Sequence, residues 1–414
     1  MCPDSTQNNV TWGQAALAYA RSLAEASALS PEVPGRGSAT EAELRAASYV
    51  SDRLAELGLA DVRRMPFDGL RSIWLFLALA FGFALTGHVA YWLLRRPLGE
   101  LLAWLFSCSA FAFAAYLMWR KFTFRDYPLR ASLPHGPSQN VVTTISPAGD
   151  VRRKVIFIAH LDSHRAVWWF ATDFLVALYA VVSPLAVYGL VLAPLAYGLA
   201  AIGELAVLSW VGLGFGLLHF VAWFTGMTAD TGPYSPGAND NASAVGVALS
   251  LAERLSEQPL AQTEVRFAFT GCEETGCDGM RAFLDEYGGE LSGALFVDFE
   301  LVGIGERLVY LQSEGVARRR RISPEVESLL KHVGSQQDLQ AIPGSGFGAF
   351  TETGVVWERG LQGATLLALR EGSTLLPEWH RMSDTPDHLQ PETLGRAHEL
   401  AWALLQEVDA GTGI

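Results

Sequence analysis

The chain has 414 residues, half of them hydrophobic, and its formal net charge is −13. An acidic balance without a basic surface to meet phosphates argues against nucleic-acid binding. The length exceeds one average domain, and the mean hydropathy of +0.21 is high for a soluble protein, so long apolar segments are expected beside an ordinary acidic domain.

The N-terminal part combines soluble and apolar character. Residues 11–60 have the spacing of soluble helix, and Asp61–Phe67 is expected to form a short strand. Ile73–Leu94 and Leu101–Trp119 are each long and apolar enough to span a bilayer. The polar turn Arg95–Glu100 separates them, so this region is interpreted as a transmembrane hairpin.

A second apolar pair follows two expected strands. Asn140–Ile145 and Lys154–Ser163 have strand character, and the latter contains an unbroken apolar run typical of a strand buried on both faces. Val167–Ala193 and Pro194–Phe224 can each hold one span. Pro194 is expected near the turn between them.

From Thr225 onward, helical and strand patterns alternate. Helices are expected at Ala242–Leu255, Asp278–Tyr287, Pro324–Val333 and Pro391–Val408, and strands at Glu264–Thr270, Ala294–Leu301, Arg307–Gln312 and Ala364–Leu369. The fold class is therefore α/β, with a mixed, mostly parallel sheet flanked by helices and interrupted by two transmembrane helical hairpins. The soluble domain comprises residues 1–70, 122–166 and 226–414, and the hairpins comprise residues 71–121 and 167–225.

Four spans place all soluble segments on one side of the membrane. The first hairpin turn carries only Arg95 and Arg96, and the second carries neither Lys nor Arg. The flanks on the soluble side are richer in basic residues, namely Arg63, Arg64, Arg71, Arg120, Lys121, Arg125 and Arg130. The positive-inside rule therefore predicts a multi-pass membrane protein with its soluble domain in the cytoplasm.

Titratable residues follow several of the expected strands. His160 and Asp162 end the buried strand, where α/β sheets place their chemistry, and a carboxylate commonly orients a metal-binding imidazole. Asp240 lies in the small-residue segment GANDNASA at a helix entrance, where an isolated Asp is more often a helix cap. Glu273 and Glu274 lie in the segment TGCEETG, directly after an expected strand. Adjacent carboxylates repel each other unless a cation or a proton intervenes.

Two further segments complete this set. Asp298 and Glu300 lie on one face of an apolar strand, where buried charges need a partner. His380 lies in the loop WHRMSDTPD before the last helix. Mixed imidazole and carboxylate ligands suit zinc, and paired zinc ions are a known hydrolytic device.

The pieces AHLDS, GANDNASA, TGCEETG, FELVG and WHRMSDTPD, in this order, resemble the M28 family of zinc aminopeptidases. By this resemblance His160 binds one zinc, with Asp162 orienting it, and Asp240 bridges two zinc ions. Glu273 is the general base, and Glu274 and His380 bind the second zinc. Glu300 is expected as the fifth ligand, with Asp298 as the alternative. The hairpin between His160 and Asp240 departs from the short loop that is typical of the family.

The resemblance implies a membrane-integrated aminopeptidase with two zinc ions per chain. Because Val167 follows Asp162 closely, the site is expected within roughly 20 Å of the bilayer surface, which favours a hydrophobic or membrane-associated peptide substrate. Hairpins that only anchor or dimerise the enzyme, giving a homo-oligomer, are the simpler interpretation. The alternatives for function are a glutaminyl cyclase-like enzyme with one zinc and a catalytically silent membrane scaffold.

Overall fold

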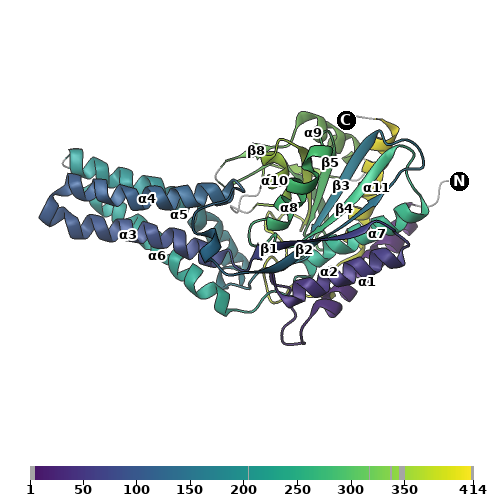
Figure 1. Cartoon of the computed structure of the whole chain (residues 1–414), viewed down its shortest axis with the longest axis horizontal. Helices are drawn as coiled ribbons and strands as arrows, with labels where there is room; N and C mark the ends of the chain where they lie inside the picture. Colours follow the sequence, from purple (N-terminus) through teal and green to yellow (C-terminus); the bar gives the residue numbers. More distant parts are fainter. Residues whose placement is uncertain (1–4, 204, 317, 336–337, 345–349, 412–414) are drawn as a thin grey trace.

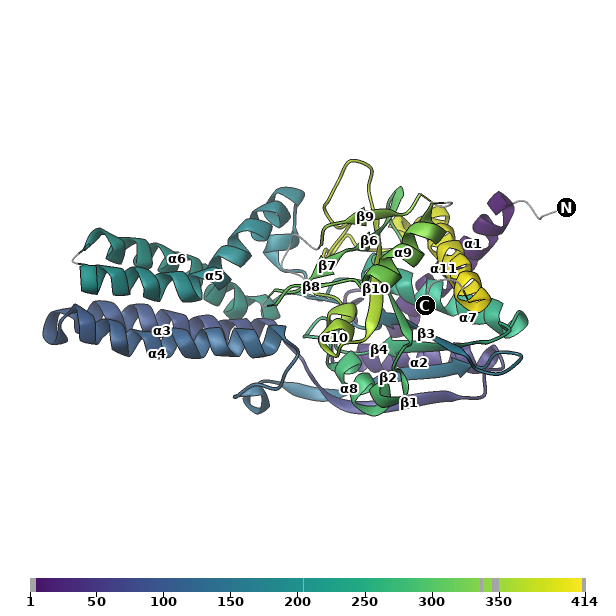
Figure 2. The same cartoon turned by 90° about the horizontal axis from the view of Figure 1, so that it is seen from above.

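The computed structural model describes residues 5–203, 205–316, 318–335, 338–344 and 350–411. It consists of an α/β domain and a rod of long helices that projects from one end of this domain (Figures 1 and 2). The rod is built from two chain segments that interrupt the α/β domain, one between β1 and β2 and one between β3 and α7.

The α/β domain contains a mixed sheet in the order β1-β2-β4-β3-β5-β10-β6-β9. Its strands are β1 (Val62–Leu70), β2 (His135–Ile145), β3 (Arg153–His160), β4 (Thr263–Thr270), β5 (Leu295–Glu300), β6 (Arg307–Leu311), β9 (Gln340–Ile342) and β10 (Gln362–Leu369). The central strands β4, β3, β5 and β10 run parallel, whereas β1, β2 and β6 join as antiparallel strands. The carboxyl ends of β3, β4 and β5 therefore meet at one edge of the sheet.

The apolar run of β3 explains its central position. Val155, Phe157 and Ala159 pack into the core on one face of the sheet, and Ile156 and Ile158 pack into the core on the other. Alternate residues of a strand point to opposite faces, so only a strand covered on both sides can bury such a run.

Helices cover both faces of this sheet. One face packs against α1 (Ser5–Ser27), α2 (Glu41–Glu56), α7 (Ser243–Glu257), α9 (Pro324–Gly334) and α11 (Pro391–Ala410). The other packs against α8 (Asp278–Tyr287) and α10 (Glu352–Glu358). A short pair, β7 (Ser313–Glu314) and β8 (Arg320–Arg321), lies beside the sheet.

The rod consists of α3 (Trp74–Leu98), α4 (Glu100–Phe122), α5 (Asp173–Gly203) and α6 (Val207–Thr228). These helices are long and apolar enough to cross a membrane by length and composition. Much of their outer surface is both exposed and hydrophobic; Leu93, for example, is 69% exposed and Leu217 is 66% exposed. Apolar groups in these positions are typical of helices that face lipid.

Close contacts hold the two hairpins together. Gly198 of α5 lies against the indole of Trp104 in α4, where a Cβ atom would come within 3.0 Å of the ring. Within the second hairpin, Gly212 of α6 lies equally close to the ring of Tyr197 in α5. Inside the rod, His88 of α3 is hydrogen-bonded to the Tyr197 hydroxyl at 2.7 Å and to His219 at 2.9 Å. Small residues and buried polar contacts of this kind are common where membrane helices associate.

Several boundaries differ from those expected from the sequence. Arg95 and Arg96 continue α3, and the first turn lies at Gly99, whose φ of +82° suits glycine. Pro194 lies inside α5 and not near a turn, so this expectation is wrong. The helix continues past Pro194, and the Trp104 indole of α4 donates a hydrogen bond to the Pro194 carbonyl at 2.8 Å.

The segment expected to begin the third span instead forms a short 3-10 turn, Trp168–Phe170, beside the carboxyl edge of the sheet, and α5 begins only at Asp173. In the N-terminal region, the helical stretch expected over residues 11–60 is divided. A loop between α1 and α2 carries Gly35–Ser38, and its Arg36 and Ser38 side chains are buried.

Candidate active site

The candidate site is built where β3, β4 and β5 end. His160 is the last residue of β3, Glu273 and Glu274 follow β4, and Glu300 ends β5. Asp240 lies in a short irregular turn (Ala238–Ala242) before α7, and His380 lies in the loop between β10 and α11. All of these side chains are buried. They come from elements that are distant in the sequence but meet at one edge of the sheet.

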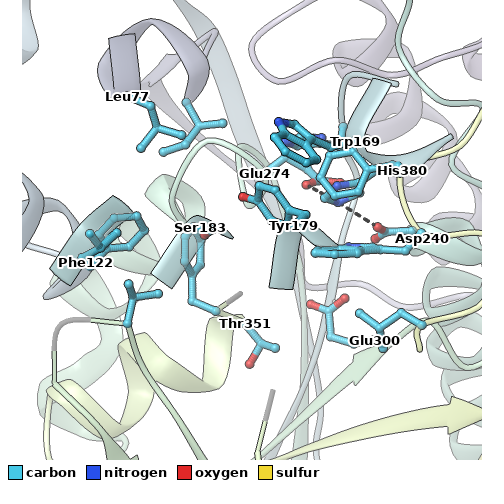
Figure 3. A pocket seen from close by; sticks show the side chains of 18 of the residues that line it. Leu77, Phe122, Trp169, Tyr179, Ser183, Asp240, Glu274, Glu300, Thr351 and His380 are labelled. Carbon is cyan, nitrogen blue, oxygen red and sulfur yellow. Dashed lines mark ion pairs between the residues drawn. The ribbon is translucent and has the colours of Figure 1, made fainter. Parts of the chain in front are cut away.

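The Asp240 carboxylate lies between two imidazoles. Its Oδ1 is 3.3 Å from Nε2 of His160, and its Oδ2 is 3.3 Å from Nε2 of His380. Glu300 Oε2 is 3.3 Å from the same His160 nitrogen, and Glu274 Oε2 is 3.2 Å from the same His380 nitrogen. The result is two three-residue groups that share Asp240, and Figure 3 shows Asp240, Glu274, Glu300 and His380 facing one cavity.

Asp298, the alternative to Glu300, contacts a different element. Its Oδ2 accepts hydrogen bonds from the backbone N–H of Thr353 at 3.0 Å and from the Thr353 hydroxyl at 3.3 Å, both in α10. Glu300, two residues further along the strand, reaches His160. The geometry favours Glu300 over Asp298 as a ligand.

Asp162 positions the backbone that carries Glu273 and Glu274. Its carboxylate accepts hydrogen bonds from the backbone N–H groups of Glu273 and Glu274 at 3.0 and 3.1 Å, and from the Ser38 hydroxyl at 2.6 Å. Nδ1 of His160 is 3.6 Å from Asp162 Oδ1 but only 3.1 Å from the backbone carbonyl of Asp162. Asp162 therefore touches His160 on its Nδ1 side while holding the loop after β4.

Glu273 belongs to neither of these two groups, although its carboxylate lies close to His160 and Glu274. Burial, reinforced by the carboxylates of Glu300 and Glu274, raises the pKa of Glu273 well above its usual value. Its Oε1 accepts a weak hydrogen bond from the thiol of Cys277 at 3.4 Å. A carboxylate in such surroundings has the raised proton affinity that a general base requires.

The donor set fits a bound metal. Burial raises the pKa of Glu300 to about 8 and that of Glu274 to about 7, so these carboxylates would be costly to ionise without a cation. Among the described residues, Oε1 of Glu274 and Oε1 of Glu300 are buried without a hydrogen-bond partner. Groups of His, Asp and Glu at this edge lie close enough to hold metal ions, and mixed nitrogen and oxygen ligands suit zinc.

Some residues of the site were not predicted from the sequence. Asp384 accepts hydrogen bonds from the backbone N–H groups of Asn239 and Asp240 at 2.7 and 3.1 Å, and so holds the turn that carries Asp240. The His164 ring stacks on His380 with a centroid distance of 3.8 Å. Their signals were present but weak: Asp384 is within WHRMSDTPD, and His164 directly follows AHLDS.

Arg36 was also missed. This side chain is fully buried and donates hydrogen bonds to the backbone carbonyls of Leu161, Pro236 and Gly237 at 2.7–2.8 Å. It therefore ties the segment after β3 to the turn that carries Asp240. A single Arg between two glycines offers little sequence signal, because its partners are carbonyl groups of distant loops.

Part of the chain matches a known peptidase family. Residues 228–405 match the model of peptidase family M28, and this span contains all of the candidate ligands except His160. The probable lipoprotein aminopeptidase LpqL of Mycobacterium tuberculosis is 29% identical over 195 residues, which cover 41% of this chain and 39% of that relative.

Solved structures show the same fold. The zinc aminopeptidase BSAP of Bacillus subtilis superposes with a TM-score of 0.53 at 15% identity, covering 96% of this chain and 95% of the other. A glutaminyl cyclase of Bacteroides thetaiotaomicron superposes with a TM-score of 0.54 at 12% identity, covering 95% and 96%. The family match and the zinc aminopeptidase neighbours support a zinc metallopeptidase.

Proposed function

We propose that this protein is a membrane-integrated M28-type aminopeptidase with two zinc ions per chain. The observation that carries this proposal is the position of Asp240, whose two carboxylate oxygens each lie 3.3 Å from a different imidazole. A carboxylate in this position is suited to bridge two metal ions. His160, Asp240 and Glu300 would hold one ion, and His380, Asp240 and Glu274 would hold the other.

Zinc held here would lower the pKa of a bound water and polarise the scissile carbonyl. The chain itself supplies the proton transfers. Glu273 Oε1 faces the Cys277 thiol, so we assign to Oε2 the proton taken from the attacking water and later delivered to the leaving amine. Asp162 keeps Glu273 in place through the backbone of the loop.

The rod would embed this enzyme in a bilayer. Its helices have sufficient length and hydropathy, and their outward faces are apolar. By the positive-inside rule, the distribution of Lys and Arg supports a cytoplasmic location for the α/β domain.

A glutaminyl cyclase-like reaction with a single zinc is the second candidate, because a glutaminyl cyclase has the same fold. The two ligand groups that share Asp240 favour the dinuclear peptidase. Zinc content separates the candidates: we expect two ions per chain for the peptidase, one for the cyclase and none for a catalytically silent membrane scaffold.

The decisive experiment is the substitution Glu273→Gln. It removes the proton acceptor but keeps the shape of the side chain, so hydrolysis of an aminoacyl anilide should fall by roughly 10²- to 10⁴-fold while zinc content, measured by mass spectrometry, stays unchanged. The matched control is Glu286→Gln, an exposed position in α8, which should retain full activity. Wild-type turnover in Glu273→Gln would refute the assigned role.

A further inference from the structure

A cavity of about 590 Å³ joins the candidate metal ligands to the interior of the helical rod. Asp240, Glu274 and Glu300 line one end of it, and side chains of all four rod helices line the other. In Figure 3, Leu77 of α3, Phe122 of α4 and Ser183 of α5 face the same space as the carboxylates. The active site therefore opens into a chamber that the α/β domain does not form alone.

The walls of this chamber are mainly apolar. Each rod helix contributes at least one apolar side chain to the walls, namely Leu77, Phe122, Val182 and Ala222. On the facing side, the sheet strands β6 and β10 contribute Leu311 and Leu367. The same strands and helices share one hydrophobic cluster, so the chamber lies at the junction of rod and domain.

The chamber is larger than one amino-acid side chain needs. On α5 its lining extends from Tyr179 to Val187, which is about 12 Å along the helix axis. Its volume falls within the range of roughly 300–1,000 Å³ that is usual for cavities holding drug-sized ligands.

The chemistry of the walls restricts what can enter. Tyr179, Ser183 and Thr225 are the hydroxyl-bearing residues that the described rod helices contribute, and the Thr225 hydroxyl already accepts a hydrogen bond from the Trp169 indole at 3.1 Å. A peptide backbone placed between these helices would lose its hydrogen bonds to water without replacing them. A hydrocarbon group incurs no such loss and gains from leaving water.

We infer that the substrate is an amide that carries, on one side of the scissile bond, a hydrocarbon group larger than a natural side chain, and that this group lies between the rod helices during hydrolysis. This inference rests on the proposed function, because it places the scissile amide at the metal ligands. It assigns the rod a direct part in substrate selection.

The first test measures kcat/KM in lipid nanodiscs for two substrate series. One series is alanine coupled to ethyl-, butyl-, hexyl- and octylamine; the other carries the same alkyl groups as the side chain of the N-terminal residue. In one series we expect kcat/KM to rise by about three- to fourfold per methylene group and to continue rising beyond butyl. A flat response in both series, or a rise that stops at butyl, would overturn the inference.

The second test uses two neighbouring valines of α5. Val182 lines the chamber, whereas Val181 is 58% exposed on the outer surface of the rod. Val182→Trp should fill the chamber and lower the octyl-to-ethyl ratio of kcat/KM at least tenfold, and Val181→Trp should leave that ratio unchanged. Partition of the substrate into the lipid is common to both variants and cancels. An equal ratio in the two variants would contradict the assignment.

A binding measurement separates this inference from the proposed function. Calorimetry of the full-length protein with 1-octanol, corrected with empty nanodiscs, should show binding that Val182→Trp weakens and Val181→Trp preserves. If no amide is hydrolysed but this difference is present, the peptidase proposal fails and the chamber assignment stands. If amides are hydrolysed but octanol binds both variants equally, the chamber assignment fails alone.

Discussion

At the scale of single residues, the candidate site depends on groups that bind backbone as much as on groups that would bind metal. Asp384 accepts two backbone N–H groups from the turn that carries Asp240. Asp162 does the same for the loop that carries Glu273 and Glu274. Two carboxylates thus position the loops while leaving the ligand side chains free.

Removing the Asp384 carboxylate should loosen the Asp240 turn. Asp384→Ala leaves two buried N–H groups without partners, so we expect a loss of about 3 kcal/mol in the free energy of unfolding together with weaker zinc retention. Asp384→Asn keeps one acceptor and should have a smaller effect. Denaturant unfolding and zinc content measure both. Asp387→Ala, at an exposed position in the same loop, is the control, and equal stability of Asp384→Ala and Asp387→Ala would disprove this role.

The choice between Glu300 and Asp298 can be tested with a matched pair of isosteric substitutions. Glu300→Gln should lower zinc affinity by at least tenfold because a charged ligand becomes neutral. Asp298→Asn should retain zinc affinity, since its carboxylate contacts Thr353 of α10. Competition with a chelator of known zinc affinity measures both variants. The reverse order of affinities would show that Asp298 is the ligand.

At the scale of elements, buried polar contacts connect the two hairpins of the rod. His88 of α3 contacts Tyr197 of α5 and His219 of α6, and His219 in turn contacts the Ala186 carbonyl at 3.0 Å. A second contact joins Tyr91 to Ser209 at 3.0 Å. Because apolar faces alone do not distinguish a partner helix from lipid, such contacts specify which helices pair.

Replacing His88 should weaken the association of the hairpins. His88→Leu leaves the Tyr197 hydroxyl and His219 Nδ1 without this partner. We expect the free energy of unfolding to fall by about 1–2 kcal/mol. Thermal unfolding in nanodiscs measures the effect. Val89→Leu is the control at the next position, where the side chain is 55% exposed on the rod surface. A melting temperature for His88→Leu equal to that of this control would mean that packing alone joins the hairpins.

At the scale of the whole molecule, both hairpins contact the loops of the candidate site. Lys121 at the end of α4 donates a hydrogen bond to the Thr275 carbonyl, next to Glu274. Arg381, which follows His380, pairs with Asp173 at the start of α5 at 2.5 Å. The rod and the loops that carry the candidate ligands are thereby joined at two points, so the rod also supports the site.

The topology of the whole chain can be tested by cysteine labelling. Leu98→Cys and Leu205→Cys place a thiol at the far end of each hairpin, and Asp150→Cys places one in the α/β domain. A membrane-impermeant maleimide should label the first two in intact cells and the third only in inverted vesicles. The unsubstituted chain measures the background from native cysteines. Labelling of Leu98→Cys and Leu205→Cys on opposite sides would contradict the paired-hairpin topology.

The sequence by itself determined the α/β fold class and which polar residues follow its buried strands. The apolar run before His160 predicted a strand buried on both faces, and the helix expected at Asp278–Tyr287 has the same bounds in the structure. Polar residues after buried strands were predicted to meet because the carboxyl ends of parallel strands share an edge. The family match over residues 228–405 supports the prediction of a zinc metallopeptidase.

Tertiary structure alone decided the features that depend on distant neighbours. Pro194 lies inside α5, where its carbonyl accepts a hydrogen bond from Trp104 of another helix, and Asp384 holds a turn more than a hundred residues earlier in the chain. Glu300 is distinguished from Asp298 by contacts with His160 and Thr353. The chamber arises only where two inserted hairpins meet the end of the sheet. Local spacing encodes strands and helices, whereas a cavity or a hydrogen bond between loops depends on how those elements pack.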